Sequence, residues 1–151
     1  MCAITVVEIV ETCIFARLLM QAIASASQKI HVVLGNVSCD LDSTVCALVY
    51  GYFQHSRHGS SAELYVPVLN IRRADYALRT DVTHVLGRCG LGDSSLLTFR
   101  SDIDLHLLQS SGRLKLTLVD WHMLPEDDSV LDDALVEVID HRPRARPDKK
   151  G

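Results

Sequence analysis

The feature that most constrains the fold is a short apolar run followed at once by an acidic loop and a helical stretch. The run Ile30–Leu34 has the length and composition of a buried strand. The loop after it carries two aspartates one residue apart, Asp40 and Asp42, and Ser43 is expected to cap a helix or lie in its first turn. Divalent cations prefer oxygen ligands, and phosphate binds free N–H groups at a helix N-terminus. The stretch therefore predicts a corner suited to a metal ion and a phosphate.

The rest of the chain alternates strand patterns with helical patterns. This alternation favours an α/β fold with a mostly parallel sheet flanked by helices and right-handed crossovers. Pro67 indicates that its strand lies near a sheet edge or ends early. After the first strand, further strands are expected at 63–69, 96–99, 114–119 and 136–139, and helices at 43–53, 76–86 and 125–135.

Three of the predicted strands end in acidic residues. Asp40 and Asp42 follow the first, Asp120 follows a later one, and Asp140 with His141 follows the last. Ligands of parallel α/β sheets bind outside the carboxyl ends of the strands. Carboxylates that gather there repel one another unless a cation compensates them. We therefore expect these strand ends to converge on a metal site.

The first 28 residues are expected to form an extension. Residues 3–10 are rich in β-branched side chains, as strands are, and the pattern beyond Thr12 is helical. Charged residues interrupt the apolar stretch and no basic region precedes it, so we expect neither a targeting peptide nor a membrane span. One apolar face is expected to pack on the sheet, and it consists of Ile14, Phe15, Leu18, Leu19, Ala22, Ile23 and Ala26.

Composition narrows the function classes. The net charge of −4 and the lack of a basic stripe argue against nucleic-acid binding. Five cysteines without a CxxC pair favour reduced thiols in an intracellular, cytoplasmic setting. The basic residues in 144–151 are expected to form a solvated tail.

Four motifs, in their order and spacing, resemble the prune branch of the DHH phosphoesterases. They are GNVSCDLDS (Gly35–Ser43), VLNI (Val68–Ile71), LVDWH (Leu118–His122) and VIDHR (Val138–Arg142). That group includes exopolyphosphatases and is related to the family II inorganic pyrophosphatases. The resemblance implies a DHH domain at 29–143, between the extension at 1–28 and the tail at 144–151. It also implies a parallel sheet flanked by helices, followed in full-length members by a second, smaller domain.

The resemblance implies a metal site of two divalent ions, manganese or magnesium. Asp40 and Asp42 match acids that bind the two ions, and Asp120 matches the acid that bridges both. His141 matches a histidine ligand or near-ligand. Asn36 stands where pyrophosphatases of the wider family use a histidine ligand, and asparagine is what the prune branch shows there.

The resemblance also implies residues at the substrate. Asn36 and Ser43 are expected to bind it, and His122 and Arg142 match residues that face the phosphates and are the candidate catalytic residues. In two-metal sites, ions about 3.5–4 Å apart clamp the reacting group and convert a bound water to hydroxide. Arg142 would offset charge on the phosphoryl oxygens. The expected function is metal-dependent hydrolysis of short polyphosphate or pyrophosphate, with further protein partners conceivable.

The sequence departs from the family at two places. Trp121 replaces the central histidine of the Asp-His-His signature, and an indole N–H can only donate. Activity should fall if that histidine supports the site directly, whereas a packing role would cost only volume. We also expect this chain to be a truncated or splice-altered product that lacks the last metal-ligating aspartate and the second domain.

Two other functions remain open on the sequence alone. The first is a catalytically dead binding or regulatory module, which keeps the fold and its partner surfaces without turnover. The second is a flavodoxin-like domain with an acidic pocket, as in receiver domains. The second fits the length but leaves the order of the four motifs unexplained.

Overall fold

A four-stranded parallel sheet lies at the centre of the protein. The computed structural model describes Glu11 and residues 28–58 and 63–142. The expected strand at 3–10, the helix beyond Thr12 and the tail at 144–151 fall outside those residues and stay predictions. The strands are β1 (Lys29–Leu34), β2 (Glu63–Val68), β3 (Leu114–Val119) and β4 (Leu135–Ile139), in the order β2-β1-β3-β4, with all neighbours parallel. The expected α/β fold is confirmed.

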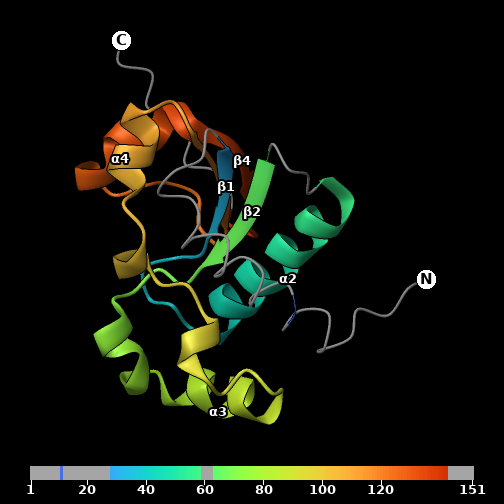
Figure 1. Ribbon diagram of the computed structural model, residues 1–151. Coiled ribbons are helices and arrows are strands. Elements are labelled where there is room, and N and C mark those ends of the chain that lie inside the picture. Colours follow the sequence, from blue (N-terminus) through green and yellow to red (C-terminus); the bar gives the residue numbers. More distant parts are fainter. Residues whose placement is uncertain (1–10, 12–27, 59–62, 143–151) are drawn as a thin grey trace.

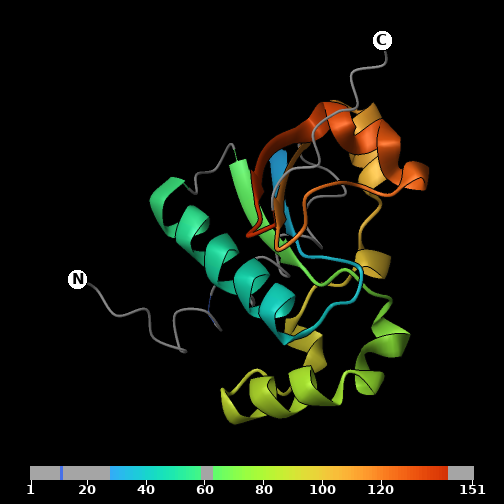
Figure 2. The ribbon, with the colours of Figure 1, turned by 180° about the vertical axis from the view of Figure 1, so that it is seen from behind.

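Helices cover both sides of the sheet. One α-helix, α2 (Leu41–His58), joins β1 to β2 and lies on the opposite side of the sheet from α4 (Leu105–Ser110) (Figures 1 and 2). The 3₁₀ helix η5 (Glu126–Ala134) joins β3 to β4. The long connection from β2 to β3 contains η2 (Arg73–Leu78), α3 (Thr80–Arg88), η3 (Ser94–Leu96), η4 (Arg100–Asp102) and α4. No helix among the described residues has both the length and the apolar character needed to cross a membrane.

The central strand β1 is apolar because both of its faces are buried. Ile30, Val32 and Leu34 belong to the main core with residues of α4 and η5. Val33 points to the other face, where it packs with Ala47 of α2. Burial on both faces produces the nearly continuous apolar run that marks a strand of a parallel sheet. The same two-sided packing fixes the point at which the chain leaves β1 for the acidic loop.

Local hydrogen bonds explain where the observed elements differ from the expected ones. The strand expected at 96–99 is wrong: η3 occupies its start, and Phe99 forms only an isolated bridge with Leu69. The side chain of Asp93 accepts a hydrogen bond from the Ser95 N–H at 2.8 Å, so a polar turn replaces the ladder. The segment expected at 125–135 is helical, but as a 3₁₀ helix. Pro67 lies in β2, an edge strand of the described sheet, as expected.

Arg73 fastens the long connection between β2 and β3. Its guanidinium donates hydrogen bonds to the carbonyl oxygens of Ser94 at 2.7 Å and Leu97 at 2.9 Å. It also pairs with Asp102 and lies 4.4 Å from the centre of the Phe99 ring. A single planar cation therefore holds η2, η3 and η4 together.

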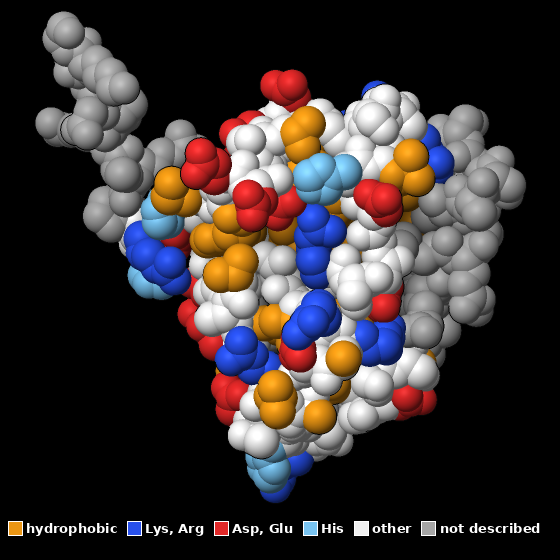
Figure 3. All heavy atoms as spheres, turned by 90° about the vertical axis from the view of Figure 1, so that its left-hand side faces the viewer, with side chains coloured by type: hydrophobic (Ala, Val, Ile, Leu, Met, Phe, Trp, Pro, Cys, Tyr) orange, Lys and Arg blue, Asp and Glu red, His pale blue; other side chains and the backbone are white. Residues whose placement is uncertain are grey.

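Basic and acidic side chains are interspersed on the face that includes α4 (Figure 3).

Replacing Arg73 by lysine should lower the free energy of unfolding by about 1–3 kcal/mol, because an ammonium group cannot reproduce the planar fork of donors. Thermal unfolding followed by circular dichroism measures the change. The matched control is Arg72→Lys, since the Arg72 side chain is 77% exposed and its ion pair with Asp75 lies at the surface. Equal losses in the two variants would contradict this account of Arg73.

Candidate metal and phosphate site

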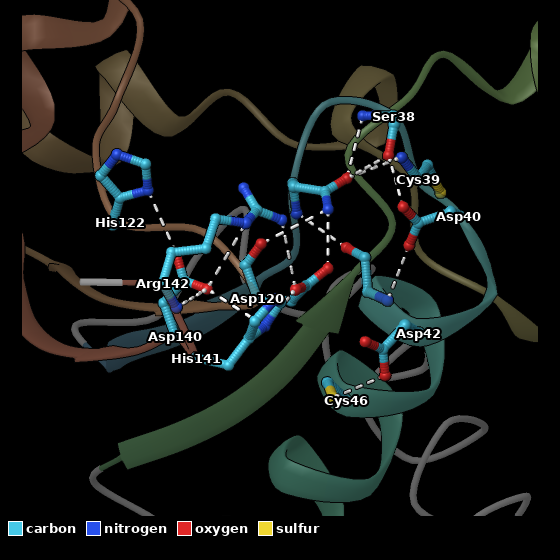
Figure 4. Close-up of polar contacts among 12 residues, drawn as sticks. Ser38, Cys39, Asp40, Asp42, Cys46, Asp120, His122, Asp140, His141 and Arg142 are labelled. Atoms are coloured by element: carbon cyan, nitrogen blue, oxygen red, sulfur yellow. Dashed lines mark hydrogen bonds and ion pairs between the residues drawn. The ribbon is translucent and has the colours of Figure 1, made fainter. Parts of the chain in front are cut away.

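The carboxyl ends of three strands meet at one corner of the sheet (Figure 4). The loop after β1 supplies residues 35–40, β3 is followed by Asp120, and β4 is followed by Asp140, His141 and Arg142. The chain leaves β1 toward β2 on one side, whereas β3 lies on the other side of β1. Such a change of direction opens a crevice where ligands of α/β proteins bind.

Asn36 joins the loop after β1 to the end of β3. Its buried side-chain amide donates a hydrogen bond of 2.7 Å to Oδ2 of Asp120. Its Oδ1 atom accepts hydrogen bonds from the N–H groups of Ser38 at 3.0 Å and Cys39 at 3.1 Å. In this structure Asn36, expected to bind substrate, is engaged with protein groups and orients the aspartate.

Hydrogen bonds hold the loop after β1 against the first turn of α2. Asp40 caps the helix, because its Oδ1 atom accepts a hydrogen bond of 3.0 Å from the Ser43 N–H. Ser43 therefore lies in the first turn, and its buried hydroxyl accepts a hydrogen bond of 2.7 Å from the Asn36 N–H. A Cβ atom on Gly35 would lie 2.2 Å from the Ser43 Oγ, so only glycine fits there without rearrangement. Asn70, at the end of β2, donates a hydrogen bond of 2.9 Å to the Gly35 carbonyl oxygen.

Asp120 is buried at the centre of the acidic corner. Burial raises its pKa, and the negative charges of Asp42 and Asp40 raise it further, whereas Arg142 and His141 act in the opposite direction. Its backbone has a φ of 52°, in the left-handed region that side-chain-bearing residues seldom adopt. Strained backbone of this kind often occurs at functional sites. Burial and the two neighbouring aspartates therefore disfavour the charged form of Asp120.

The DxD aspartates differ in their environment. The Ser43 N–H lowers the pKa of Asp40 by hydrogen bonding to its carboxylate. Asp42 lies on the first turn of α2, with Cys46 one turn further along at 3.8 Å from Oδ1 to Sγ. Asp42 and Asp120 lie in the same corner (Figure 4), and the negative charge of Asp42 raises the pKa of Asp120.

The residues after β4 complete the corner from the other side. His122 Nδ1 lies 3.1 Å from Oδ2 of Asp140. The Asp140 side chain is nearly buried; burial raises its pKa, but hydrogen bonds from the Arg142 N–H and His122 outweigh burial and lower it. Arg142 Nη2 and His141 Nδ1 approach Oδ1 of Asp120 to 3.4 Å and 3.5 Å. Asp140 is thus a member of the corner for which the sequence suggested no individual role, although it stands inside the VIDHR motif.

A set of metal-donor atoms is present in the corner. Asp120, Asp140 and His141 each offer one ligand atom, and these atoms lie within 4.8 Å of one another. The residues expected at the site lie in this region: Figure 4 shows Asp40, Asp42, Asp120, His122, His141 and Arg142, and hydrogen bonds join the buried Asn36 and Ser43 to them. Carboxylate oxygens and imidazole nitrogens are both ligands of divalent cations in proteins.

Trp121 points away from the site. Its side chain is buried in the main apolar core, whereas the neighbouring His122 reaches Asp140. Of the two roles considered for this position, packing is the one that the tryptophan has in this chain. Its indole fills core volume between the end of β3 and the connection to η5.

Curated proteins of the prune type resemble this chain over most of its length, although no family model matches it. The exopolyphosphatase PRUNE1 of Homo sapiens is 45% identical over 123 residues, and that of Bos taurus is 46% identical over 123 residues. Each comparison covers 82% of this chain and 27% of the relative. The protein prune homolog 2 of Mus musculus is 38% identical over 112 residues, which are 74% of this chain and 4% of that protein.

The chain spans about a quarter of the length of the PRUNE1 proteins that it matches. Identity at this level along so much of the chain confirms the resemblance that the four motifs carry. The chain is therefore a prune-type protein and belongs to the family of the PRUNE1 exopolyphosphatases.

Proposed function

We propose that this site hydrolyses a phosphoanhydride bond of short polyphosphate or pyrophosphate with the help of divalent metal. The observation that carries the proposal is that Asp40 and Asp42, which follow β1, meet Asp120, which follows β3, beside Arg142. The exopolyphosphatase name of the PRUNE1 relatives supports this reaction class. Acidic groups would bind metal, and the adjoining arginine would bind phosphate.

The charges of the corner favour a cation. The pKa of Asp120 is raised by burial and by its acidic neighbours, and a cation would relieve that repulsion. Two ions of manganese or magnesium would be held by Asp40, Asp42, Asp120 and His141, as in the two-metal sites of other phosphatases. A bound divalent ion supplies a water of lowered pKa at neutral pH.

The protein groups have their own parts in the reaction. Arg142 is partly exposed and close to Asp120, so its guanidinium can bind phosphoryl oxygens and offset their charge as it grows. Asp140 faces Nδ1 of His122, which leaves Nε2 to accept or hold a proton. Asn36 keeps the Asp120 carboxylate in one orientation. Arg142 would thus bind phosphate, Asn36 would orient Asp120, and His122 would transfer a proton.

A binding or regulatory module without turnover is the second candidate. Trp121 favours it, because this tryptophan stands at the position of the family's central histidine and packs in the apolar core. Such a module would keep the metal corner and the fold while losing hydrolysis. Metal binding and phosphate release therefore have to be measured separately.

Manganese should raise the melting temperature of the full chain. A ligand at about 100 times its dissociation constant stabilises a protein by about 2.7 kcal/mol. Differential scanning fluorimetry with and without MnCl₂, after chelator treatment, measures the shift. Asp120→Ala should abolish it, whereas the control Asp81→Ala, at an exposed position of α3, should retain it. A shift of the same size in Asp120→Ala would rule out the proposed ligand set.

The purified chain should release phosphate from tripolyphosphate when manganese is present. Arg142→Lys should reduce the rate about 10- to 100-fold, because lysine cannot bind two phosphoryl oxygens through a planar fork. A colorimetric assay of inorganic phosphate measures the rate. No release from a chain that manganese still stabilises would reject hydrolysis and leave the module.

A further inference from the structure

One half of the sheet face that carries α2 has no helix over it among the described residues. The crossover α2 packs on β1 and β2, while α4 and η5 pack on the opposite face. The neighbouring strands β3 and β4 therefore leave a groove beside α2. It has a volume of about 430 Å³ and is lined mainly by Val45, Cys46, Val49, Phe53, Val119 and Ile139.

Several apolar side chains that line the groove are more exposed to solvent than core residues are. Val45, Phe53 and Ile139 are 38%, 39% and 42% exposed. They lie on two different elements, α2 and β4, that face each other across the groove. Contiguous apolar surface of this kind marks a place where another apolar surface binds.

We propose that the segment Ile14–Ala26 of this same chain occupies the groove as an amphipathic helix. Its apolar residues recur at helical spacing and need a surface to pack on. Thirteen helical residues extend about 20 Å. The six-residue strands of the sheet are about 20 Å long as well. Residues 12–27 lie outside the described part of the chain, so the proposal rests on the groove and on the sequence pattern.

The connection to β1 places the segment beside the groove. Two residues, Ser27 and Gln28, separate the segment from Lys29, where β1 begins, and a connection this short is common between a helix and a strand. The guanidinium of Arg113, which precedes β3, donates a hydrogen bond of 3.0 Å to the Gln28 carbonyl oxygen. The chain is thereby held next to β3 as it enters β1, and the uncovered half of the face begins at β3.

This placement fixes the direction of the segment. A helix that ends at the amino end of β1 runs antiparallel to that strand, so its first residues lie at the carboxyl edge of the sheet. Cys13 would then lie near Cys46, which lines the groove in the second turn of α2. The two native cysteines provide a direct measurement of the contact.

The test is cross-linking of the full chain with a short bismaleimide, after Cys2 and Cys89 have been replaced by serine. The expected product is a monomer in which peptide mass spectrometry finds Cys13 joined to Cys46. The matched control moves the thiol along α2 by combining Cys46→Ser with Ser56→Cys, an exposed position at the other end of the helix, and should lose the product. A linked dimer would show that a second copy fills the groove, and no Cys13–Cys46 product would overturn the proposal.

A pair of alanine variants separates helix docking from chance proximity. Ala22 lies in the middle of the expected apolar face, and Ala24 lies on the opposite side of the helix at 100° per residue. Ala22→Glu should reduce the linked fraction about tenfold or more, because it would bury an unpaired carboxylate. Ala24→Glu should leave the fraction unchanged. Equal effects of the two variants would overturn the proposed helix face, and neither readout depends on hydrolysis.

Discussion

The hydrogen bond from Asn36 to Asp120 is the contact on which the geometry of the corner depends. It joins a loop after the first described strand to a carboxylate that follows the third, 84 residues later. The asparagine can do this because the loop N–H groups fix its carbonyl oxygen and thereby aim its amide nitrogen. Gly35 and Ser43 hold the backbone of the same asparagine. A few buried polar groups thus convert two strand ends into one site.

Electrostatic repulsion and hydrogen bonding oppose each other in this corner. A helix N–H stabilises the charged form of Asp40, whereas burial and negative neighbours disfavour the charged form of Asp120. Arg142 offsets part of that repulsion and lies at the rim, where a phosphate would also arrive. In the proposed reaction the arginine would have two alternative anionic partners, Asp120 and a phosphate, and a cation bound to the carboxylates would free it for the phosphate.

Sequence patterns predicted the sheet and the corner because both depend on local composition. The run Ile30–Leu34 is apolar as a result of burial on two faces, and aspartates at strand ends converge in any parallel sheet. The strand order could not settle the family, since β2-β1-β3-β4 is also the order at the start of flavodoxin-like sheets. The four motifs and the relatives separate these families.

The remaining differences arise from contacts that a linear pattern does not contain. Residues 96–99 have strand-like side chains, yet an aspartate three positions earlier captures a backbone N–H and bends the chain. Asp140 is surrounded by residues with assigned roles, and its own role becomes visible only in its contacts with His122 and Arg142. Trp121 could have stood in the site or in the core, and the structure places it in the core.

The left-handed backbone of Asp120 ties the site to the completion of the sheet. Its N–H donates a hydrogen bond of 2.8 Å to the carbonyl oxygen of Ile139, the final residue of β4. Without β4 this N–H would lack its hydrogen-bond acceptor. During synthesis from the ribosome, a chain that has emerged only as far as Asp120 would contain three of the four aspartates of the corner, but not the strand to which the Asp120 N–H is bonded. The end of the last described strand thus supplies Asp140 and also the carbonyl oxygen that holds the Asp120 backbone.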